Sequence, residues 1–186
     1  LIMDEIYHGL CFRGRAQSAL AYTDNAIIVN SFSKYFCMTG WRLGWVVLPD
    51  DLVQTAERLA QNLYISAPTL NQIGAIAAFD CYDELDAHIP RYQENRDLLY
   101  RGLSRTFLGD HAPSEGAFYL YADVSALTHD SVAFAGRLLA ETGVAITPGV
   151  DFDACQGKTH VRLSYAGSTQ DIKKAVQRIN TWIAKT

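Results

Sequence analysis

Three groups of polar residues follow predicted strands near the start of the sequence. Ser31-Phe32-Ser33-Lys34 comes directly after the apolar segment 27–30, and Asp4 and Tyr7 stand at the end of the apolar segment 1–3. Arg42 follows Lys34 by eight positions. Open α/β sheets bind ligands beyond the carboxyl ends of their strands, so we expect these groups to lie at one crevice.

The residue types around Lys34 suit a cofactor that carries both an aldehyde and a phosphate. A lysine amine forms a Schiff base with an aldehyde, provided that its site favours the neutral amine. Hydroxyls and a guanidinium bind phosphate, and Ser31, Ser33 and Arg42 supply them. Pyridoxal 5'-phosphate (PLP) has both groups, so we predict that Lys34 binds it covalently.

Asp4 and Tyr7 fit the other end of the same cofactor. A carboxylate opposite the pyridine nitrogen keeps that nitrogen protonated, so that the ring acts as an electron sink. A phenol can donate a hydrogen bond to the ring oxygen. Taken singly, each residue has an ordinary explanation, such as a turn-forming Asp, a packed Tyr, or an Arg42 that stacks on Trp41. Their order and spacing together favour the PLP site.

This combination of motifs resembles the class I/II aminotransferases of PLP fold type I. That family has an Asp-x-x-Tyr motif, then Ser-x-Ser-Lys, then an arginine eight residues later in a Gly-Trp-Arg context. The resemblance extends over essentially the whole chain. It implies a large PLP-binding α/β domain, a small C-terminal domain, and a homodimer with active sites at the subunit interface, which the segment 64–69 would approach.

The resemblance also assigns a role to Arg162. The family carries a late arginine that binds the substrate α-carboxylate, and segment 161–166 is similar to that strand, as segment 147–152 is to the loop before it. On a strand, Arg162 alternates with Val161 and Leu163, so its head can face a cleft. A structural ion pair with a nearby Asp or Glu is the alternative.

The pattern along the chain predicts an α/β fold in three parts. Residues 1–82 resemble the C-terminal portion of the large domain, with buried parallel strands at 27–30 and 43–48, a helix after Pro49 and a second helix over 70–79. Residues 83–109 are expected to form a long linking helix with a kink or late start at Pro90. Residues 110–186 are expected to form a small α+β domain, in which Tyr119 and Tyr121 pack in the core or at a domain interface. Strands are predicted there at 117–124, 144–147 and 160–165, and helices at 132–142 and after a capping box at 168–171.

The composition and charge of the chain limit the classes of partner that it is expected to bind. The net charge is −4 with interspersed signs, and no apolar run is long enough to span a bilayer, so neither nucleic acid nor a membrane is expected. The histidines form no metal-like cluster, and we expect no metal site. Four scattered cysteines favour reduced thiols and a cytoplasmic location.

Three functions remain open from the sequence. Transamination between an α-amino acid and a 2-oxo acid is preferred, with Lys34 moving the α-proton. A PLP-dependent lyase has the same site architecture, and an aminotransferase-like sensor domain of a transcription regulator is a third reading. The chain opens within a strand, so we expect an N-terminally truncated fragment that is inactive alone, because the family's phosphate-binding turn and stacking aromatic lie upstream.

Overall fold

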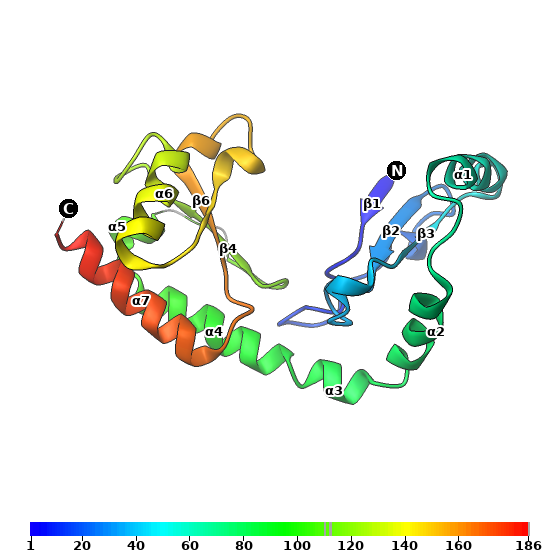
Figure 1. Cartoon of the computed structure of the whole chain (residues 1–186), viewed down its shortest axis with the longest axis horizontal. Coiled ribbons are helices and arrows are strands. Elements are labelled where there is room, and N and C mark those ends of the chain that lie inside the picture. The colour runs from blue at the N-terminus through cyan, green and yellow to red at the C-terminus, as the bar shows by residue number, and fades with distance from the viewer. Residues whose placement is uncertain (110, 112, 186) are drawn as a thin grey trace. The chain divides into compact units, whose positions relative to one another are not determined.

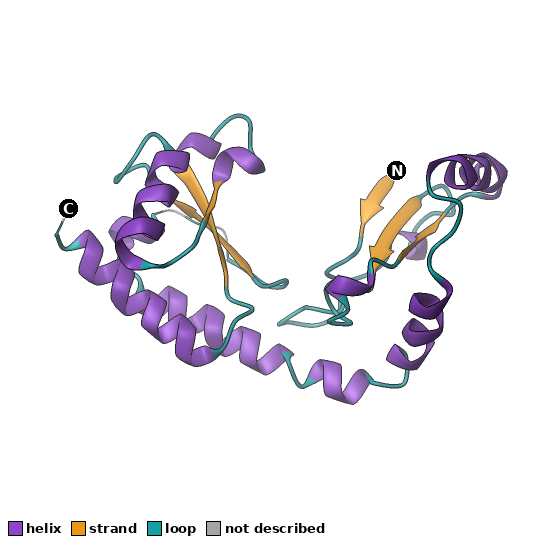
Figure 2. Ribbon diagram, viewed as in Figure 1, coloured by secondary structure: helices purple, strands orange, loops and turns teal. Residues whose placement is uncertain are grey.

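The computed structural model describes residues 1–109, 111 and 113–185, and the chain divides into two compact units, Leu1–Ile89 and Pro90–Thr186. Each unit has its own three-stranded sheet (Figures 1 and 2).

The sheet of the first unit has the order β1-β2-β3, with β1 at Ile2–Asp4, β2 at Ile27–Ser31 and β3 at Gly44–Val47. β1 and β2 are parallel, as predicted, with Ile2 opposite Ile27. β3 is antiparallel to β2, so the expectation of a parallel strand over 43–48 was wrong. A parallel neighbour needs a crossover connection, usually a helix, whereas the chain between β2 and β3 forms a loop and one short 3-10 turn, η2 (Thr39–Trp41), and returns in the opposite direction.

The helices of the first unit follow the sheet in the chain. α1 spans Asp50–Leu63, α2 spans Thr69–Ala78 and α3 spans Tyr82–Asp86, while the 3-10 turn η1 (Ala19–Ala21) precedes β2. The two longer helices agree with the apolar spacing in the sequence. Each starts after a proline, which is suited to a helix N-terminus because its missing N–H would have no partner there.

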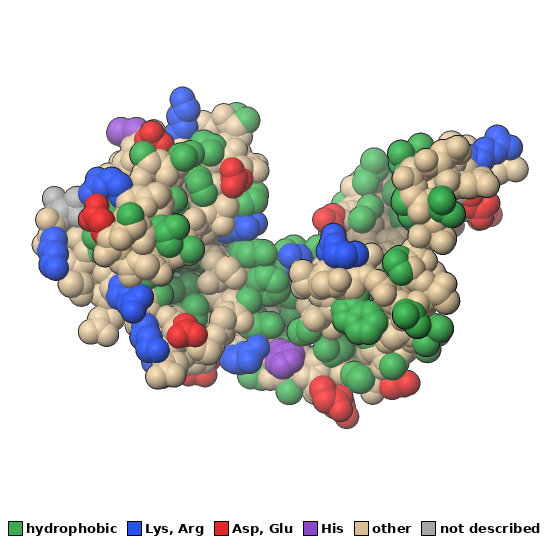
Figure 3. All heavy atoms as spheres, in the orientation of Figure 1, with side chains coloured by type: hydrophobic (Ala, Val, Ile, Leu, Met, Phe, Trp, Pro, Cys, Tyr) green, Lys and Arg blue, Asp and Glu red, His purple; other side chains and the backbone are tan. Residues whose placement is uncertain are grey.

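The first unit buries few of its large apolar side chains. All four residues of β3 are exposed, so the expectation of a buried strand there was also wrong. Exposed apolar residues continue along α1 and α2, over which Figure 3 shows several hydrophobic side chains at the surface. The most exposed of these side chains are Leu63 of α1 and Leu70 and Ile76 of α2, and Ile65, between the two helices, is exposed as well.

The second unit packs its helices on one face of an antiparallel sheet of order β4-β6-β5. Its strands are β4 (Tyr119–Asp123), β5 (Thr147–Pro148) and β6 (His160–Ser164). Its α-helices are α4 (Ile89–Gly102), α5 (Arg105–Leu108), α6 (Ser131–Thr142) and α7 (Thr169–Ile183), with 3-10 turns η3 (Gly149–Asp151) and η4 (Gly157–Thr159). The strand expected over 144–147 was wrong except at Thr147, because residues 144–146 are not in a strand and β5 begins at Thr147.

The core of the second unit follows the alternation of its strands. Leu120 and Ala122 of β4 lie opposite Leu163 and Val161 of β6, and all four are buried. The other face of the same strands carries polar and aromatic side chains, so one face packs the core and the other is available for binding.

The helical stretch expected over residues 83–109 is divided into α3, α4 and α5. Pro90 is the second residue of α4, consistent with the late helix start that its restricted backbone predicts. Asn95 of α4 is fully buried, and its side-chain amide donates to the carbonyls of Tyr165 and Gly167 at 3.0 Å each. These bonds fix α4 to the end of β6.

The last helix begins with a modified capping box. The Ser168 hydroxyl accepts a hydrogen bond from the Asp171 backbone N–H at 3.1 Å, as in the standard motif. Asp171, one methylene shorter than Glu, accepts from the Ser168 hydroxyl instead of from its backbone N–H. The predicted helix start is therefore confirmed, while the return bond of the box is different.

Candidate functional site

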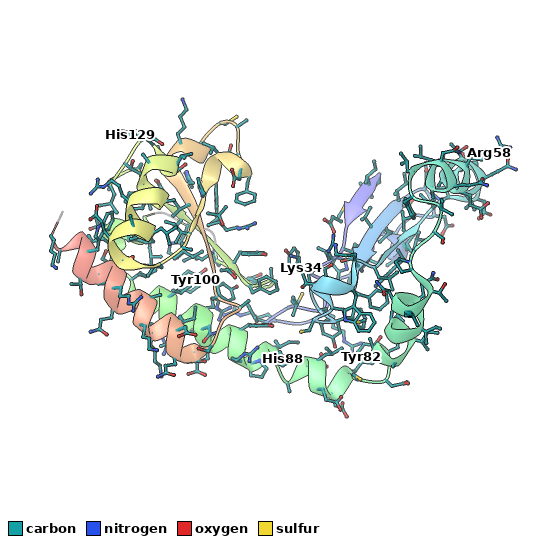
Figure 4. All side chains as sticks on the ribbon, viewed as in Figure 1. Lys34, Arg58, Tyr82, His88, Tyr100 and His129 are labelled. Atoms are coloured by element: carbon teal, nitrogen blue, oxygen red, sulfur yellow. The ribbon has the colours of Figure 1, made fainter. Side chains whose placement is uncertain are left out.

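Parallel pairing of β1 and β2 brings the predicted cofactor residues to one edge of the sheet. Asp4 is the last residue of β1 and lies opposite Val29 of β2, and Ser31 ends β2 two residues later. Lys34 follows in the turn after β2 (Figure 4). The Lys34 ammonium nitrogen lies 5.9 Å from the centroid of the Tyr7 ring, so the structure brings these two predicted residues together.

The two acidic residues at the end of β1 have different surroundings. Glu5 is buried, and its carboxylate accepts hydrogen bonds from the Ser18 hydroxyl and the Ala19 N–H and pairs with His8 at 3.3 Å. Asp4 is exposed and accepts from the Ile6 N–H alone at 3.1 Å, with no ion pair among the described residues. Asp4 is thus the carboxylate that remains available to a ligand.

Buried aromatic packing fixes the strand end just before Lys34. The Phe32 ring is buried, with centroids 4.9 Å from Phe36, 5.1 Å from Trp45 and 5.6 Å from Phe79. On the same stretch, the Ser31 hydroxyl accepts from the Ser33 N–H at 3.1 Å. The Phe32–Phe36 contact and the Ser31–Ser33 hydrogen bond therefore restrain the backbone on both sides of Ser33.

Tyr35 anchors the chain on the other side of Lys34. Its hydroxyl donates to the Asp86 carboxylate of α3 at 2.6 Å. Burial raises the pKa of the Tyr35 phenol above its ordinary value, and the bond to Asp86 raises it further, so the phenol keeps its proton. Gly9 leaves room for the ring, because a Cβ there would lie 2.4 Å from it. Sequence reasoning missed this contact, whose partners are 51 positions apart.

Arg42 lies in a left-handed turn at the end of η2, with φ 50° and ψ 48°. Such a backbone is uncommon for a residue other than glycine or asparagine, and unusual conformations of this kind cluster at functional sites. Its guanidinium is exposed, donates to the Thr39 carbonyl at 3.0 Å, and has no carboxylate within 4.0 Å among the residues that the structure describes. Most of its N–H donors are thus available to an anion.

The turn that carries Arg42 is fixed by α2. The Asn71 side chain donates to the Trp41 carbonyl at 2.5 Å, and a Cβ on Gly74 would lie 2.5 Å from the Trp41 ring. The indole therefore packs against the helix backbone. In the part of the chain that the structure describes, Arg42 does not stack on Trp41, so this alternative for Arg42 was wrong.

Arg162 belongs to the second unit and lies on the polar face of its sheet, opposite Tyr121 of β4 and Thr147 of β5. The predicted alternation is confirmed, since Val161 and Leu163 are buried on the other face. Within the described ranges, no carboxylate lies within 4.0 Å of its guanidinium, which argues against the structural ion pair. The Arg162 Nε and the Tyr121 hydroxyl are both buried without a hydrogen-bond partner.

Two aromatic rings contact the Arg162 guanidinium. Its Cζ lies 4.2 Å from the centroid of Tyr119 and 4.0 Å from that of Phe152. Tyr119 was expected to pack in the core or at an interface, and Phe152 was not singled out. The strand alternation could have placed Tyr119 on the face of Arg162, whereas the Phe152 contact depends on how the loop before β6 folds.

The described residues offer no alternative metal or membrane site. Among them, no three His, Cys, Asp or Glu side chains are grouped so as to hold a metal ion. A search of the described helices likewise finds none with the length and apolar character needed to cross a bilayer.

The sequence of the chain matches a known protein family. A sequence profile described as "Aminotransferase class I and II" matches residues 1–179. The chain belongs to this family. It is 49% identical to the valine–pyruvate aminotransferase of Mycobacterium tuberculosis, over 98% of this chain and 48% of that protein.

Solved structures show the same α/β fold. A crystal structure of an aminotransferase from Mycobacterium tuberculosis has a TM-score of 0.92 at 47% identity and covers 100% of this chain and 49% of its own. A Methanococcus jannaschii protein, described as similar in its active site to kynurenine aminotransferases, has a TM-score of 0.88 at 36% identity, over 98% and 49%. The chain spans about half the length of the curated relatives it matches.

The Tyr35–Asp86 bond leads to a prediction about the Lys34 turn. We expect Tyr35→Phe to speed amide hydrogen exchange of residues 33–37 several-fold, because a solvent-exposed hydrogen bond of this kind contributes about 1 kcal/mol. Tyr82→Phe is the matched control, since Tyr82 is also aromatic, contacts the same cluster, and has no hydrogen bond from its hydroxyl among the described residues. Equal exchange in both variants would show that the bond does not anchor the turn.

Proposed function

We propose that this chain is part of a PLP-dependent aminotransferase that moves an amino group between an α-amino acid and a 2-oxo acid. The observation that carries the proposal is the position of Lys34, in the turn after β2 and beside Tyr7, with Asp4, which has no ion pair among the described residues, at the end of the adjacent parallel strand. We further propose that the first unit is part of the large PLP-binding domain and the second is the small C-terminal domain.

The side chains of the first unit fit PLP in the chemistry of their donors. The Arg42 guanidinium lacks an acidic partner among the described residues and would bind the phosphate with the hydroxyls of Ser31 and Ser33. The Asp4 carboxylate would hold the proton of the pyridine nitrogen. A guanidinium and a carboxylate that lack ion-pair partners in the described part of the chain suit the phosphate and pyridine ends of one ligand.

Each residue at the reacting end has a definite task. Lys34 would bind the cofactor through its amine and, once displaced by the substrate amine, move the proton of the substrate α-carbon. Tyr7, whose ring lies near that amine, would donate its phenolic proton to the cofactor's ring oxygen. When bound, PLP supplies a ring that withdraws electrons from the α-carbon.

We propose that Arg162 binds the substrate carboxylate. A carboxylate accepts two parallel hydrogen bonds from a guanidinium, and the described part of the chain leaves that of Arg162 without an anion. This role explains affinity for an α-amino acid and a 2-oxo acid alike, because both carry the carboxylate.

We also propose a cytoplasmic homodimer. Leu70, Ile73 and Ile76 of α2 form a largely exposed apolar stripe at helical spacing, and nearby Ile65 has a positive φ of 71°. Exposed apolar stripes of this kind are typical of surfaces that another chain covers. All four cysteines are free thiols, which favours a reducing compartment.

Single-turnover product analysis of the intact protein tests the reaction. Protein loaded with PLP is mixed with a panel of α-amino acids in the absence of a 2-oxo acid. We expect one equivalent of 2-oxo acid per site and no ammonia, because the amino group stays with the protein–cofactor complex until an acceptor arrives. Release of ammonia or a thiol would contradict transamination and favour a lyase.

Two substitutions test the proposed phosphate contact and the proposed ring-nitrogen contact separately. We expect Arg42→Ala to weaken PLP binding about 10- to 100-fold, since a charge-assisted hydrogen bond is worth about 1.5–3 kcal/mol. Asp4→Ala is expected chiefly to slow turnover, because the ring nitrogen loses the carboxylate that keeps it protonated. PLP titration and kcat distinguish the two effects.

Arg58→Ala in α1 is the control for loss of an exposed arginine, and we expect it to change neither quantity. Normal turnover in Asp4→Ala would rule out its role at the ring nitrogen. Wild-type PLP affinity in Arg42→Ala would rule out the phosphate contact.

A further inference from the structure

Arg162 is an ordered cation without a counter-ion among the described residues. No hydrogen bond or ion pair from its guanidinium is present there, and its Nε is buried. Burying an unpaired polar atom is costly, so buried polar groups in native proteins nearly always have a partner. Some other feature must therefore hold the side chain in this position.

Two aromatic rings, Tyr119 and Phe152, provide that feature, and we call them the aromatic clamp. The Arg162 Cζ lies over each ring, within 4.2 Å of its centroid and inside the range of a cation–π interaction. Rings contact the faces of a guanidinium, whereas its N–H donors lie in its plane. The clamp can thus restrain the cation without using the donors that a carboxylate needs.

Close backbone packing brings Phe152 to Arg162. The Phe152 N–H donates to the Gly149 carbonyl at 2.9 Å and closes the η3 turn. That turn packs against η4 and the start of β6, because a Cβ on Gly149 would lie 2.5 Å from the His160 carbonyl and 2.7 Å from that of Gly157. The position of Phe152 therefore depends on a contact between two glycines.

Hydrophobic burial does not explain why an aromatic ring stands at position 152. The residue is 51% exposed, so about half of its surface gains nothing from the hydrophobic effect. The contact with the Arg162 cation is a specific interaction of its ring. Tyr119 reaches the same guanidinium from β4, as a diagonal neighbour of Arg162 next to its direct partner Tyr121.

We propose that Phe152 and Tyr119 are positioning residues that hold the Arg162 guanidinium ready for the substrate carboxylate. The inference rests on the proposed role of Arg162. An arginine side chain carries about 2 kcal/mol of rotamer entropy, and restraining it beforehand reduces the loss on binding. The clamp acts on substrate affinity and leaves the cofactor contacts of Lys34 unchanged.

The test compares variants of the intact, PLP-loaded protein. Phe152→Leu keeps an apolar side chain but removes the ring, and we expect it to raise KM for α-amino acids about 3- to 10-fold with kcat nearly unchanged. Binding of propionate, an unreactive monocarboxylate measured by calorimetry, should weaken by the same factor. Phe152→Tyr should restore both values, because half of the side chain is exposed and has room for the hydroxyl.

Two further variants extend the test to the second ring and supply a control. Tyr119→Leu should raise KM and weaken propionate binding as Phe152→Leu does, which tests the clamp through a second residue. Val150→Ala removes an exposed apolar side chain from the same turn and should behave as wild type. PLP affinity should not change in any of these proteins.

Arg162→Lys separates failure of the inference from failure of the proposed function. If it leaves KM and propionate binding at wild-type values, Arg162 does not bind the carboxylate, and the clamp has no role. If it raises KM while Phe152→Leu and Tyr119→Leu remain at wild-type values, the clamp inference alone is overturned. A loss of kcat without a change in KM in the two leucine variants would also overturn it.

Discussion

The parallel pairing of β1 with β2 is the constraint on which the cofactor site depends. Parallel strands end at the same edge of a sheet, so Asp4 ends β1 opposite Val29, only two residues before Ser31 ends β2, although 27 positions separate Asp4 and Ser31 in the sequence. Lys34 and Tyr7 then follow in the connections that leave this edge. A shift of β1 by one residue would turn Asp4 to the other face of the sheet and remove the carboxylate from the site.

Around this edge, the polar groups that position the site have hydrogen-bond partners within the protein. The charged groups proposed to bind the cofactor have no ion-pair partner among the described residues. Glu5 and the Tyr35 phenol are fully engaged by neighbours, and they hold the connections in place. Asp4 and Arg42 have no ion-pair partner among the described residues. The same division recurs in the second unit, where rings rather than acids contact Arg162. Charges kept in this way remain available to a charged ligand.

Much of the fold followed from local signals in the sequence. Apolar spacing and terminal residues predicted α1, α2, α6 and α7, and alternation predicted which face of β6 carries Arg162. The direction of β3 was not predictable in this way, because strand type and length say nothing about the path of the connection. The contacts of Tyr35 with Asp86 and of Phe152 with Arg162 depend on how loops pack against separate segments. Local sequence patterns do not predict such packing.

The most direct test of the lysine-centred site is the identity of the residue that holds PLP. Borohydride reduction of the intact holoprotein fixes the cofactor to its lysine, and peptide mapping locates the label. We expect the pyridoxyl group on Lys34, and we expect Lys34→Ala protein to remain unlabelled under the same conditions. A label on another lysine, or full labelling of the Lys34→Ala protein, would contradict the assignment.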